Sequence, residues 1–381
     1  MPKIILDRTI KQQILKRLVP NKVIVLLGPR RVGKTVLINQ LLEKTSEPYM
    51  LLNGENIDVR KRLEYRSTQN YRNLLGSKRF LIIDEAQKIP EVGQILKLMV
   101  DEIEGLKVLV TGSSAFDINK YTGEPLTGRK KTFNLFALSE KELEQTEDEI
   151  DRPANLRQRL IYGNYPELIH LVDSEDKTDY LKELVSSYLL KDILEFENIK
   201  NSDKIFDLLR LIAFQIGSEV SNTELGQQLS MSKNTVDKYL DLLSKVYILH
   251  SVGAFSRNLR KEIVKAKRWY FYDNGIRNIL IGNMNPIEIR NDIGQLWENY
   301  VISERLKYQS YSRMLVYNYF WRTYDQQEID WIEDREGILH AYEIKWNPLR
   351  KVKQPAAWKS TYKNSTFEVI NNGNYHEWIK K

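Results

Sequence analysis

The chain has 381 residues, which is too long for one ordinary hydrophobic core and long enough for two or three domains. Hydrophobic residues make up 42% of it and charged residues 29%, which excludes a chain that is disordered throughout. There is no cysteine, so disulfides and thiolate metal sites are excluded, in keeping with a reducing cytoplasm.

The formal net charge of the chain is +7. That excess favours contact with a polyanion such as nucleic acid, because condensed counterions are released when Lys and Arg meet phosphates. A basic protein without such a partner is the alternative. Charges lie too close together near the N-terminus for a signal peptide, and no apolar run approaches the roughly 20 residues that span a bilayer. We therefore expect a cytoplasmic protein with no membrane partner.

The pattern of apolar residues changes three times along the chain. From residue 23 to about 136, short apolar segments alternate with amphipathic ones, which predicts a parallel sheet covered by helices. The acidic segment 140–151 predicts an exposed helix end that runs into a linker. Helical patterns dominate residues 156–249, and aromatic and β-branched segments follow. We predict an α/β domain over residues 1–150, a helical region over 151–265 and a second α/β domain over 266–381.

A nucleotide-binding pattern, Gly-Pro-Arg-Arg-Val-Gly-Lys-Thr, occupies residues 28–35. It lies between the strand-like segment 23–27 and the helix-like segment 36–42, as the motif G-x-x-x-x-G-K-T requires. Its glycines let backbone N–H groups wrap phosphates, and the helix N-terminus adds positive partial charge. Lys34 should reach the β- and γ-phosphates of ATP, and the hydroxyl of Thr35 should bind Mg²⁺. The residues expected to contact ATP are Gly28, Pro29, Arg30, Arg31, Val32, Gly33, Lys34, Thr35 and Val36.

The partner motif, Phe-Leu-Ile-Ile-Asp-Glu, covers residues 80–85. A buried strand would deliver Asp84 at its carboxyl end, where the carboxylate can hold the Mg²⁺ shell. Glu85 follows and is placed to act as the general base that activates the attacking water.

A third strand-like segment, 107–111, ends in Gly-Ser-Ser. We expect Ser113 to stand beside the γ-phosphate and detect hydrolysis, with Thr111 and Ser114 as neighbours; a helix cap is the alternative role. Farther on, Arg129 follows a turn. It could be an arginine finger for an adjacent subunit of a homo-oligomer, or it could pair with a local carboxylate.

These motifs resemble those of the prokaryotic AAA+-type ATPases that carry a C-terminal domain of unknown function. The segments that carry the resemblance are Gly-Pro-Arg-Arg-Val-Gly-Lys-Thr, Ile-Ile-Asp-Glu-Ala-Gln, Thr-Gly-Ser-Ser and Leu-Thr-Gly-Arg, followed by Ala-Leu-Ser at 137–139, Gly-Asn-Tyr-Pro-Glu at 163–167 and Tyr-Leu-Leu-Lys-Asp-Ile-Leu at 188–194. The resemblance covers nearly the full chain and implies a P-loop fold and an ATPase activity. Asn164 departs from it, since a second glycine is usual there.

The middle region predicts a winged helix-turn-helix. Residues 221–230 and 231–243 have the pattern of two helices, the second starting at a Ser cap, and the β-rich segment 247–252 follows. Ser232, Lys233, Asn234 and Thr235 would then front the second helix, where DNA readers place base contacts. A lid or a protein-docking surface is the alternative. Basic residues just beyond are better candidates for phosphate contact, with a solvated face as the alternative: Arg257, Arg260, Lys261, Lys265, Lys267 and Arg268.

The C-terminal region contains a second group of chemistry-bearing residues. Segments 328–332 and 341–346 predict a hairpin. Glu343 and Lys345 would point to one face of it, and Asp330 would face them from the neighbouring strand. Two carboxylates and an ammonium could bind Mg²⁺, with Lys345 orienting water or stabilising the phosphorane. A surface salt bridge between strands is the alternative.

Together with Glu298 on a helical segment upstream, this pattern resembles the PD-(D/E)xK restriction-nuclease fold. The resemblance implies Asp330, Glu343 and Lys345 as catalytic residues and Glu298, Asp330 and Glu343 as metal ligands. Cleavage is a separate hypothesis from the fold, because many such domains only bind. Nearby aromatic residues are expected to pack in the core and rim rather than to stack on bases: Trp321, Tyr324, Trp331 and Trp346.

The predicted fold class is α/β, with an N-terminal P-loop NTPase (AAA+-like) parallel sheet, a central helical and winged-helix region, and a C-terminal restriction-nuclease-like α/β domain. The leading hypothesis is an ATPase that binds ATP and Mg²⁺ and acts as a switch on nucleic acid. The rival is a signalling ATPase whose C-terminal half is a protein-docking module. A toxin–antitoxin or phage-defence component is a weaker alternative.

Overall fold

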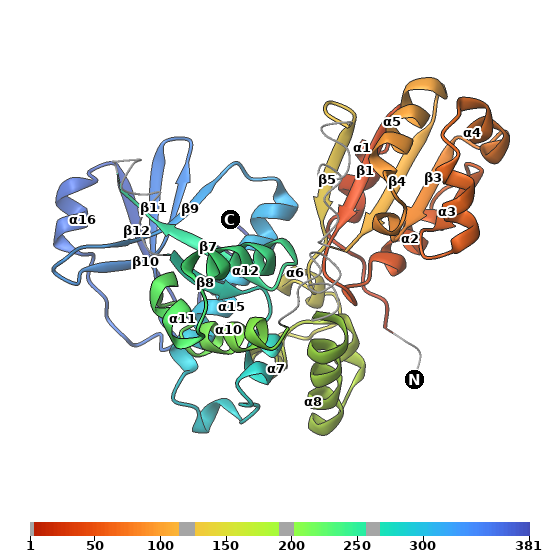
Figure 1. The fold of residues 1–381 in the computed structure, drawn as a ribbon. Helices are drawn as coiled ribbons and strands as arrows, with labels where there is room; N and C mark the ends of the chain where they lie inside the picture. Colours follow the sequence, from red (N-terminus) through yellow and green to blue (C-terminus); the bar gives the residue numbers. More distant parts are fainter. Residues whose placement is uncertain (1–3, 114–125, 190–201, 257–266) are drawn as a thin grey trace. The chain divides into compact units, whose positions relative to one another are not determined.

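A computed structural model describes residues 4–113, 126–189, 202–256 and 267–381 of the chain. The chain divides into two compact units, residues 1–145 and residues 146–381, each built around its own sheet (Figure 1). The mixed α/β class and the parallel sheet of the first unit are as predicted. Several residues named above lie outside the described residues: Ser114, Arg257, Arg260, Lys261, Lys265 and residues 190–194.

The first unit is a five-stranded parallel sheet with helices along the chain between its strands. Its strand order is β2-β3-β4-β1-β5, and every neighbouring pair is parallel. The elements in chain order are α1 (Lys11–Arg17), β1 (Lys22–Leu27), α2 (Lys34–Leu42), β2 (Tyr49–Asn53), α3 (Ile57–Glu64), α4 (Thr68–Leu75), β3 (Phe80–Asp84), the 3₁₀ turn η1 (Ala86–Lys88), α5 (Val92–Glu102), β4 (Lys107–Gly112), β5 (Lys130–Asn134) and α6 (Glu140–Leu143).

The central strands β1, β3 and β4 are apolar and buried because helices cover the sheet on both faces. Alternate side chains of these strands, such as Val23, Leu81 and Val108, share one core with Leu96 and Met99 of α5. The three strands are the ones expected from the sequence. Since they run in parallel, their carboxyl ends meet at one edge of the sheet, which is where the nucleotide motifs lie.

The acidic segment 140–151 is largely exposed from residue 144 onward, as its composition predicts, but the acidic residues of the short helix α6 at its start are not. Both Glu140 and Glu142 are fully buried. Glu142 accepts a hydrogen bond from the backbone N–H of Thr9 at 2.8 Å and lies 3.1 Å from Arg8 Nε. Burial opposes ionisation of Glu142, but the charge of Arg8 and the backbone donors lower its pKa below the usual value. These two carboxylates belong to the packed interior of the first unit.

The second unit has a seven-stranded mixed sheet with the order β12-β11-β10-β9-β7-β8-β6. Its elements in chain order are α7 (Arg152–Tyr162), η2 (Pro166–His170), α8 (Ser174–Glu183), the π-helix η3 (Leu184–Leu189), α10 (Ser202–Phe214), β6 (Glu219–Val220), α11 (Asn222–Gln228), α12 (Lys233–Lys245), β7 (Leu249–Ala254), β8 (Lys267–Phe271), α14 (Asn274–Leu280), η4 (Ile287–Ile289), α15 (Ile293–Ser312), β9 (Tyr317–Arg322), β10 (Glu328–Arg335), β11 (Ile338–Ile344), α16 (Ala356–Thr361), β12 (Ser365–Ile370) and α17 (Tyr375–Trp378).

The helical region and the C-terminal α/β region share this sheet. The predicted helices α11 and α12 are present, and their caps Ser221 and Ser232 accept hydrogen bonds from backbone N–H groups. β7, which follows them, pairs with β8 on one side and runs parallel to β9 on the other. A boundary at residue 265 would therefore separate β7 from its antiparallel partner. The division of this unit into two domains stays a prediction.

The turn at residues 163–167 is fixed by a buried aspartate. Gly163 has φ +78°, and a Cβ at this position would lie 1.9 Å from Asp273 Oδ1. The backbone N–H of Asn164 donates to Asp273 Oδ2 at 2.7 Å, and its side-chain amide donates to Glu304 Oε1 at 3.0 Å. The asparagine that departs from the family resemblance thus ties the turn to α15.

Candidate functional site

The nucleotide motif forms the loop between β1 and α2. Gly28 follows β1 directly, and Gly33 at φ +93° precedes the first residue of α2. A Cβ on Gly28 would lie 2.1 Å from the carbonyl oxygen of Leu135, so no larger residue fits there without backbone movement. Arg31, within the loop, also has a positive φ, +65°. The loop is therefore held in a backbone shape that few sequences allow, which is typical of a functional turn.

Lys34 lies folded into this loop. Its Nζ donates to the carbonyl oxygens of Gly28 at 2.8 Å and Pro29 at 2.9 Å, and its side chain is buried. Arg8, which no sequence motif marks, braces the loop: it donates to the carbonyl oxygens of Val32 and Phe136, each at 2.6 Å. The ammonium thus donates to two backbone carbonyls of the loop, at the place where a phosphate chain would bind.

The ends of β3 and β4 bring oxygen groups next to α2. Thr35 Oγ1 donates to Asp84 Oδ2 at 3.0 Å, and the hydroxyl of Thr111 donates to Asp84 Oδ1. Thr111 Oγ1 in turn accepts from the backbone N–H of Glu85 at 3.2 Å. A hydroxyl and a carboxylate side by side are the hard oxygen ligands that Mg²⁺ prefers, so Thr35 and Asp84 fit the metal of a nucleotide complex.

Glu85 stands one residue beyond β3 in a left-handed conformation, with φ +52°. Its carboxylate accepts a hydrogen bond from Gln87 Nε2 at 2.6 Å, and the same nitrogen lies 3.3 Å from Ser113 Oγ. Ser113 is buried at the end of β4. The structure thus joins the predicted base to the predicted sensor through Gln87, a residue that the sequence motif contained but did not mark.

Arg129 lies at the opposite edge of the sheet. Its carbonyl accepts from the backbone N–H of Val23 at the start of β1, and its Nε donates to Asp101 Oδ1 at 2.5 Å. β1 has six residues, so roughly 15 to 20 Å separate Arg129 from the phosphate-binding edge. The local ion pair expected as the alternative is present. A role as an arginine finger could concern only another subunit and stays a prediction.

In the second unit, the structure brings the hairpin residues together as the sequence predicts. Lys345 Nζ lies 2.7 Å from Glu343 Oε1 and 3.2 Å from Asp330 Oδ2, and Asp330 Oδ2 also accepts from the backbone N–H of Ile344 at 2.8 Å. Glu298, on α15, accepts from the hydroxyl of Tyr270 at 2.8 Å. We call these four residues, Glu298, Asp330, Glu343 and Lys345, the hairpin cluster.

The carboxyl groups of the hairpin cluster influence one another. Burial and then the negative charge of Asp330 raise the pKa of Glu298 to about 8, and the same two causes raise the pKa of Glu343 to about 7. Burial opposes protonation of Lys345, yet the charges of Asp330 and Glu343 raise its pKa. Perturbed buried groups of this kind gather at functional sites, although structural ion pairs produce them as well.

Arg268 lies next to the hairpin cluster. The sequence suggested that it is an exposed phosphate contact or part of a solvated face, and both expectations are wrong because its side chain is buried. Its guanidinium is buried on β8, where Nη2 lies 2.9 Å from Glu328 Oε2 and Nη1 lies 3.9 Å from Asp330 Oδ1. The guanidinium also covers the ring of Phe320 at 4.5 Å. The basic run around Arg268 in the sequence concealed this, because a charge run usually marks a solvated surface.

The hairpin cluster does not fit a metal ion as it is arranged. Within the part of the chain that the structure describes, no group of three or more histidine and acidic side chains is placed to hold one. Two cations, Arg268 and Lys345, already stand among the carboxylates. Glu298, Asp330 and Glu343 as metal ligands stay a prediction from the sequence, and no metal-dependent step follows from this geometry.

Asn299 fixes Glu298 against the sheet. Its side-chain oxygen accepts from the backbone N–H of Phe271 at 2.7 Å, and its nitrogen donates to the carbonyl oxygen of the same residue at 3.1 Å. Asn299 thus forms with the backbone of Phe271 the pair of hydrogen bonds that a neighbouring strand would form with β8. The same nitrogen also donates to Asn274 Oδ1 at 2.6 Å, and this hydrogen bond links α15 to α14.

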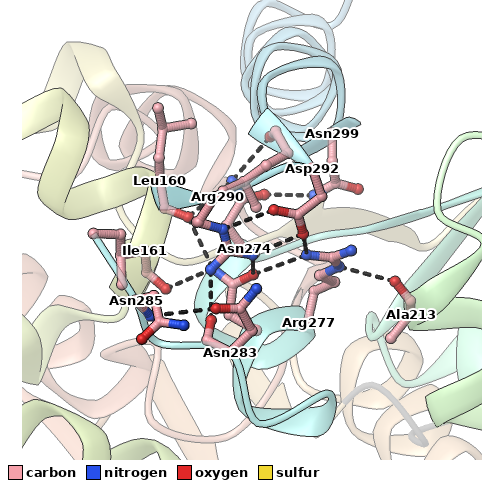
Figure 2. Close-up of polar contacts among 12 residues, drawn as sticks. Leu160, Ile161, Ala213, Asn274, Arg277, Asn283, Asn285, Arg290, Asp292 and Asn299 are labelled. Carbon is pink, nitrogen blue, oxygen red and sulfur yellow. Dashed lines mark hydrogen bonds and ion pairs between the residues drawn. The ribbon is translucent and has the colours of Figure 1, made fainter. Parts of the chain in front are cut away.

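The N-terminal end of α15 is anchored by a buried polar network, drawn in Figure 2. Asp292, just before the helix, is paired with both Arg277 and Arg290, and Arg277 Nε donates to the carbonyl oxygen of Ala213 at 2.9 Å. Burial alone would raise the pKa of Asp292, but hydrogen bonds from Arg290 and Arg277 lower it to about 2. The helix that carries Glu298 is thereby joined to α10 and α14.

The aromatic residues near the hairpin divide as expected between core and rim. Trp321 and Trp331 are buried, and Tyr324 is fully exposed. Trp346 packs edge-on against Trp297 with ring centroids 5.2 Å apart. At the predicted DNA-reading helix, Ser232 Oγ and Thr235 Oγ1 are 2.8 Å apart, while Lys233 and Asn234 are exposed. Contact of this helix with DNA stays a prediction.

Among the described residues, every helix is too short or too polar to cross a bilayer.

Comparison with known proteins assigns the first unit and leaves the second without a function. Residues 20–144 match the family model described as an AAA domain. Residues 153–286 and 293–380 match two models described as domains of unknown function, DUF8612 and DUF4143.

Relatives similar to the whole chain carry no function in their names. An uncharacterized protein of Mycobacterium tuberculosis is 25% identical over 330 residues, which are 85% of this chain and 70% of the relative. An uncharacterized protein of Haemophilus influenzae is 24% identical over 380 residues, 93% of this chain and 89% of the relative.

Solved structures show only distant likeness. The Holliday junction branch migration motor RuvB of Thermotoga maritima has 18% identity and a TM-score of 0.32, covering 65% of this chain and 92% of its own. A signal transduction ATPase of Pyrococcus horikoshii has 12% identity and a TM-score of 0.31, covering 82% and 48%. The family match and the loop between β1 and α2 therefore carry the assignment: the first unit has the P-loop AAA-type ATPase fold, and its G-x-x-x-x-G-K-T motif is complete.

Proposed function

We propose that the first unit binds ATP with Mg²⁺ and hydrolyses it. The observation that carries this proposal is the 3.0 Å hydrogen bond between Thr35 Oγ1 and Asp84 Oδ2. It joins the helix after the phosphate loop to the end of β3, which is the pairing that a Mg²⁺–nucleotide site needs. Bound there, Mg²⁺ would neutralise charge on the β- and γ-phosphates.

The chain's own residues supply the remaining chemistry. Lys34 exchanges its bonds to the Gly28 and Pro29 carbonyls for the β- and γ-phosphates, since charged oxygens are the stronger acceptors. Glu85 takes a proton from the attacking water. The water oxygen forms a bond to the γ-phosphorus while the bond from that phosphorus to the bridging oxygen breaks, which leaves ADP and inorganic phosphate.

Two substitutions test binding and hydrolysis separately. Removing the ammonium in Lys34→Ala should weaken ATP binding by about tenfold to a hundredfold, the loss of a charge-assisted contact. Glu85→Gln should keep ATP binding and lower turnover by roughly 10² to 10⁴-fold. Calorimetry with ATP and Mg²⁺, together with phosphate release, measures both. A folded wild-type protein without affinity for any nucleoside triphosphate would contradict the proposal.

A second candidate function concerns the second unit. We infer that it acts on nucleic acid, by binding or by cleavage, as the output of an ATP-driven switch in the cytoplasm. The observation that favours this is the buried hairpin cluster, whose Asp330 bonds both to Lys345 and to the backbone of β11. The net charge of +7 supports a polyanionic partner.

This second function has a clear test. Gel shift and Mg²⁺-dependent cleavage of several DNA and RNA substrates would be measured for wild type, Asp330→Ala and Lys345→Ala. Loss of binding or of cleavage in both variants supports the inference. If wild type neither binds nor cuts any of them, the rival holds: a signalling ATPase whose second unit docks a protein, in which Asp330→Ala leaves every activity intact.

A further inference from the structure

Gln87 lies between the two groups expected to manage hydrolysis. It sits in the 3₁₀ turn η1 directly after Glu85, and its Nε2 donates to Glu85 Oε2 at 2.6 Å. The same nitrogen lies 3.3 Å from Ser113 Oγ at the end of β4. The left-handed conformation of Glu85 starts this turn and lets the chain fold back, so that a side chain two residues later reaches the carboxylate.

The orientation of the Gln87 amide follows from its partner. A carboxylate only accepts hydrogen bonds, so the amide nitrogen must face Glu85, and the reverse orientation would set two oxygens against each other. The amide oxygen, Oε1, then has no hydrogen-bond partner among the described residues although it is buried. A buried acceptor without a partner costs free energy, and one that stands beside a catalytic base indicates a ligand that supplies the donor.

We propose that Gln87 is a positioning residue for ATP hydrolysis, which orients both the Glu85 carboxylate and the attacking water. The inference rests on the proposed function of the first unit. Water carries two O–H groups: one is directed at the free oxygen of Glu85, the proton acceptor, and the other at Gln87 Oε1. With both hydrogens held by protein acceptors, a lone pair of the water oxygen is left for the γ-phosphorus.

The contact with Ser113 gives this arrangement a second consequence. Ser113 directly follows β4, the strand that lies between β1 and β3 in the sheet, beside the phosphate-binding edge. A movement of Ser113 on loss of the γ-phosphate would reach Glu85 through a single shared nitrogen. Gln87 therefore couples the state of the nucleotide to the orientation of the base.

The test compares two variants that differ in one property. Gln87→Met keeps the length of the side chain and removes both the donor and the acceptor. It should lower kcat by roughly tenfold to a hundredfold and leave KM and the Kd for ATP within about twofold. Gln87→Glu keeps an acceptor but sets a second carboxylate beside Glu85. It should lower kcat at least as far as Gln87→Met does, again with KM and the Kd for ATP within about twofold, because the donor to Glu85 is lost and the two carboxylates repel each other.

A matched control is Gln69→Met on α4, where the glutamine is exposed and bonds only to Asn73 four residues on. This variant should retain wild-type kcat. Unchanged kcat in both Gln87 variants, in a protein whose Glu85→Gln variant is inactive, would overturn the inference and leave the proposed function intact. A parallel loss of ATP binding and of kcat in both Gln87 variants would also overturn it, by showing a purely structural role. A wild-type protein without turnover would overturn the proposed function itself.

Discussion

Each unit places a lysine beside the end of a strand, Lys34 buried and Lys345 half-buried, but the two lysines have different partners. Lys34 in the first unit donates to two neutral backbone carbonyls. Lys345 in the second unit is paired with two carboxylates. A cation held by neutral oxygens gains when a triphosphate replaces them, whereas a cation held by carboxylates must first lose partners of full charge. Lys34 can therefore exchange two carbonyls for phosphate oxygens, whereas Lys345 already has carboxylate partners.

The carboxylates differ in the same way. Asp84 accepts bonds from two neutral hydroxyls, those of Thr35 and Thr111. Asp330 is bonded to a lysine and lies near a buried arginine. A metal ion can replace these hydrogen bonds to Asp84 without leaving a buried charge unpaired. In the second unit, binding of a metal or a phosphate requires the cations or the carboxylates to rearrange.

The largest expected effect is a backbone clash that disables one unit alone. Gly28→Ala would place a Cβ 2.1 Å from the carbonyl oxygen of Leu135, so the phosphate loop or the strand end must shift. We expect loss of measurable ATP binding and a destabilisation of about 3 kcal/mol or more, as for other overpacked sites. Calorimetry and denaturant unfolding measure these.

The matched control lies in the hairpin of the second unit. Gly337 has φ +80°, and a Cβ added there would meet no atom within 4 Å, so Gly337→Ala costs only backbone strain of about 1 kcal/mol. It should leave ATP binding unchanged. Equal loss of ATP binding in both variants would show that the nucleotide loop is not specially constrained.

The next effect tests the two lysines directly. Lys345→Met leaves the carboxylates of Asp330 and Glu343 without their ammonium, and the free energy of unfolding should fall by about 2 kcal/mol, less than for a fully dry pair. Lys34→Met leaves two carbonyls that water can satisfy, at about 1 kcal/mol or less. Denaturant unfolding of both variants without nucleotide gives the comparison. A larger loss in Lys34→Met would reverse the distinction drawn between the sites.

The sequence predicted the first site more completely than the second because its pattern is local. The loop at residues 28–35 is one continuous segment of sequence, and so is the strand that ends in Asp84. Because parallel strands end at the same edge of a sheet, Thr35 could be expected to meet Asp84 although 49 residues separate them. The hairpin residues could also be paired from their alternation. Burial of Arg268 among carboxylates could not be foreseen, since it depends on β8 joining the C-terminal strands in one sheet.

Other residues were missed for the same reason. Arg8 contacts Phe136, 128 residues away, and no periodic pattern in the sequence marks that pairing. Gln87 is next to a recognised motif, but its role depends on the side-chain rotamer and on Ser113, not on its position in the chain. Glu142 looked like part of an exposed acidic run, and only its partner Arg8 explains why it is buried.

A smaller effect distinguishes the units by the sign of their pH dependence. Glu298 and Glu343 have folded-state pKa values of about 8 and about 7, above the ordinary 4.5, owing to burial and to the charge of Asp330, with Arg268 and Lys345 opposing. These two carboxyl groups therefore hold more protons in the folded unit than in the unfolded chain between about pH 4.5 and 8, so the stability that they contribute falls as pH rises through that window.

The first unit should show the opposite sign. The pKa of Glu142 is lowered, so its contribution is present above pH 4.5 and is lost as the pH falls below that value. Unfolding followed separately in each unit from pH 8 down to well below pH 4.5 measures both slopes, and Glu298→Gln should flatten the slope of the second unit. A second unit that becomes more stable from pH 5 to pH 8 would contradict the assignment of these raised values.

The smallest effect concerns Arg129, which pairs with Asp101 at the edge of the sheet away from the nucleotide. Both side chains are about one-third exposed, so Arg129→Ala should cost less than about 1 kcal/mol of stability. Because the residue lies at the wrong edge to reach its own site, turnover at high dilution should be unchanged. If Arg129 serves a neighbouring subunit, wild-type turnover per molecule rises with protein concentration and the variant loses that rise. Phosphate release measured over a range of concentrations decides between the local pair and the finger, since only the finger makes the rate depend on how often two chains meet.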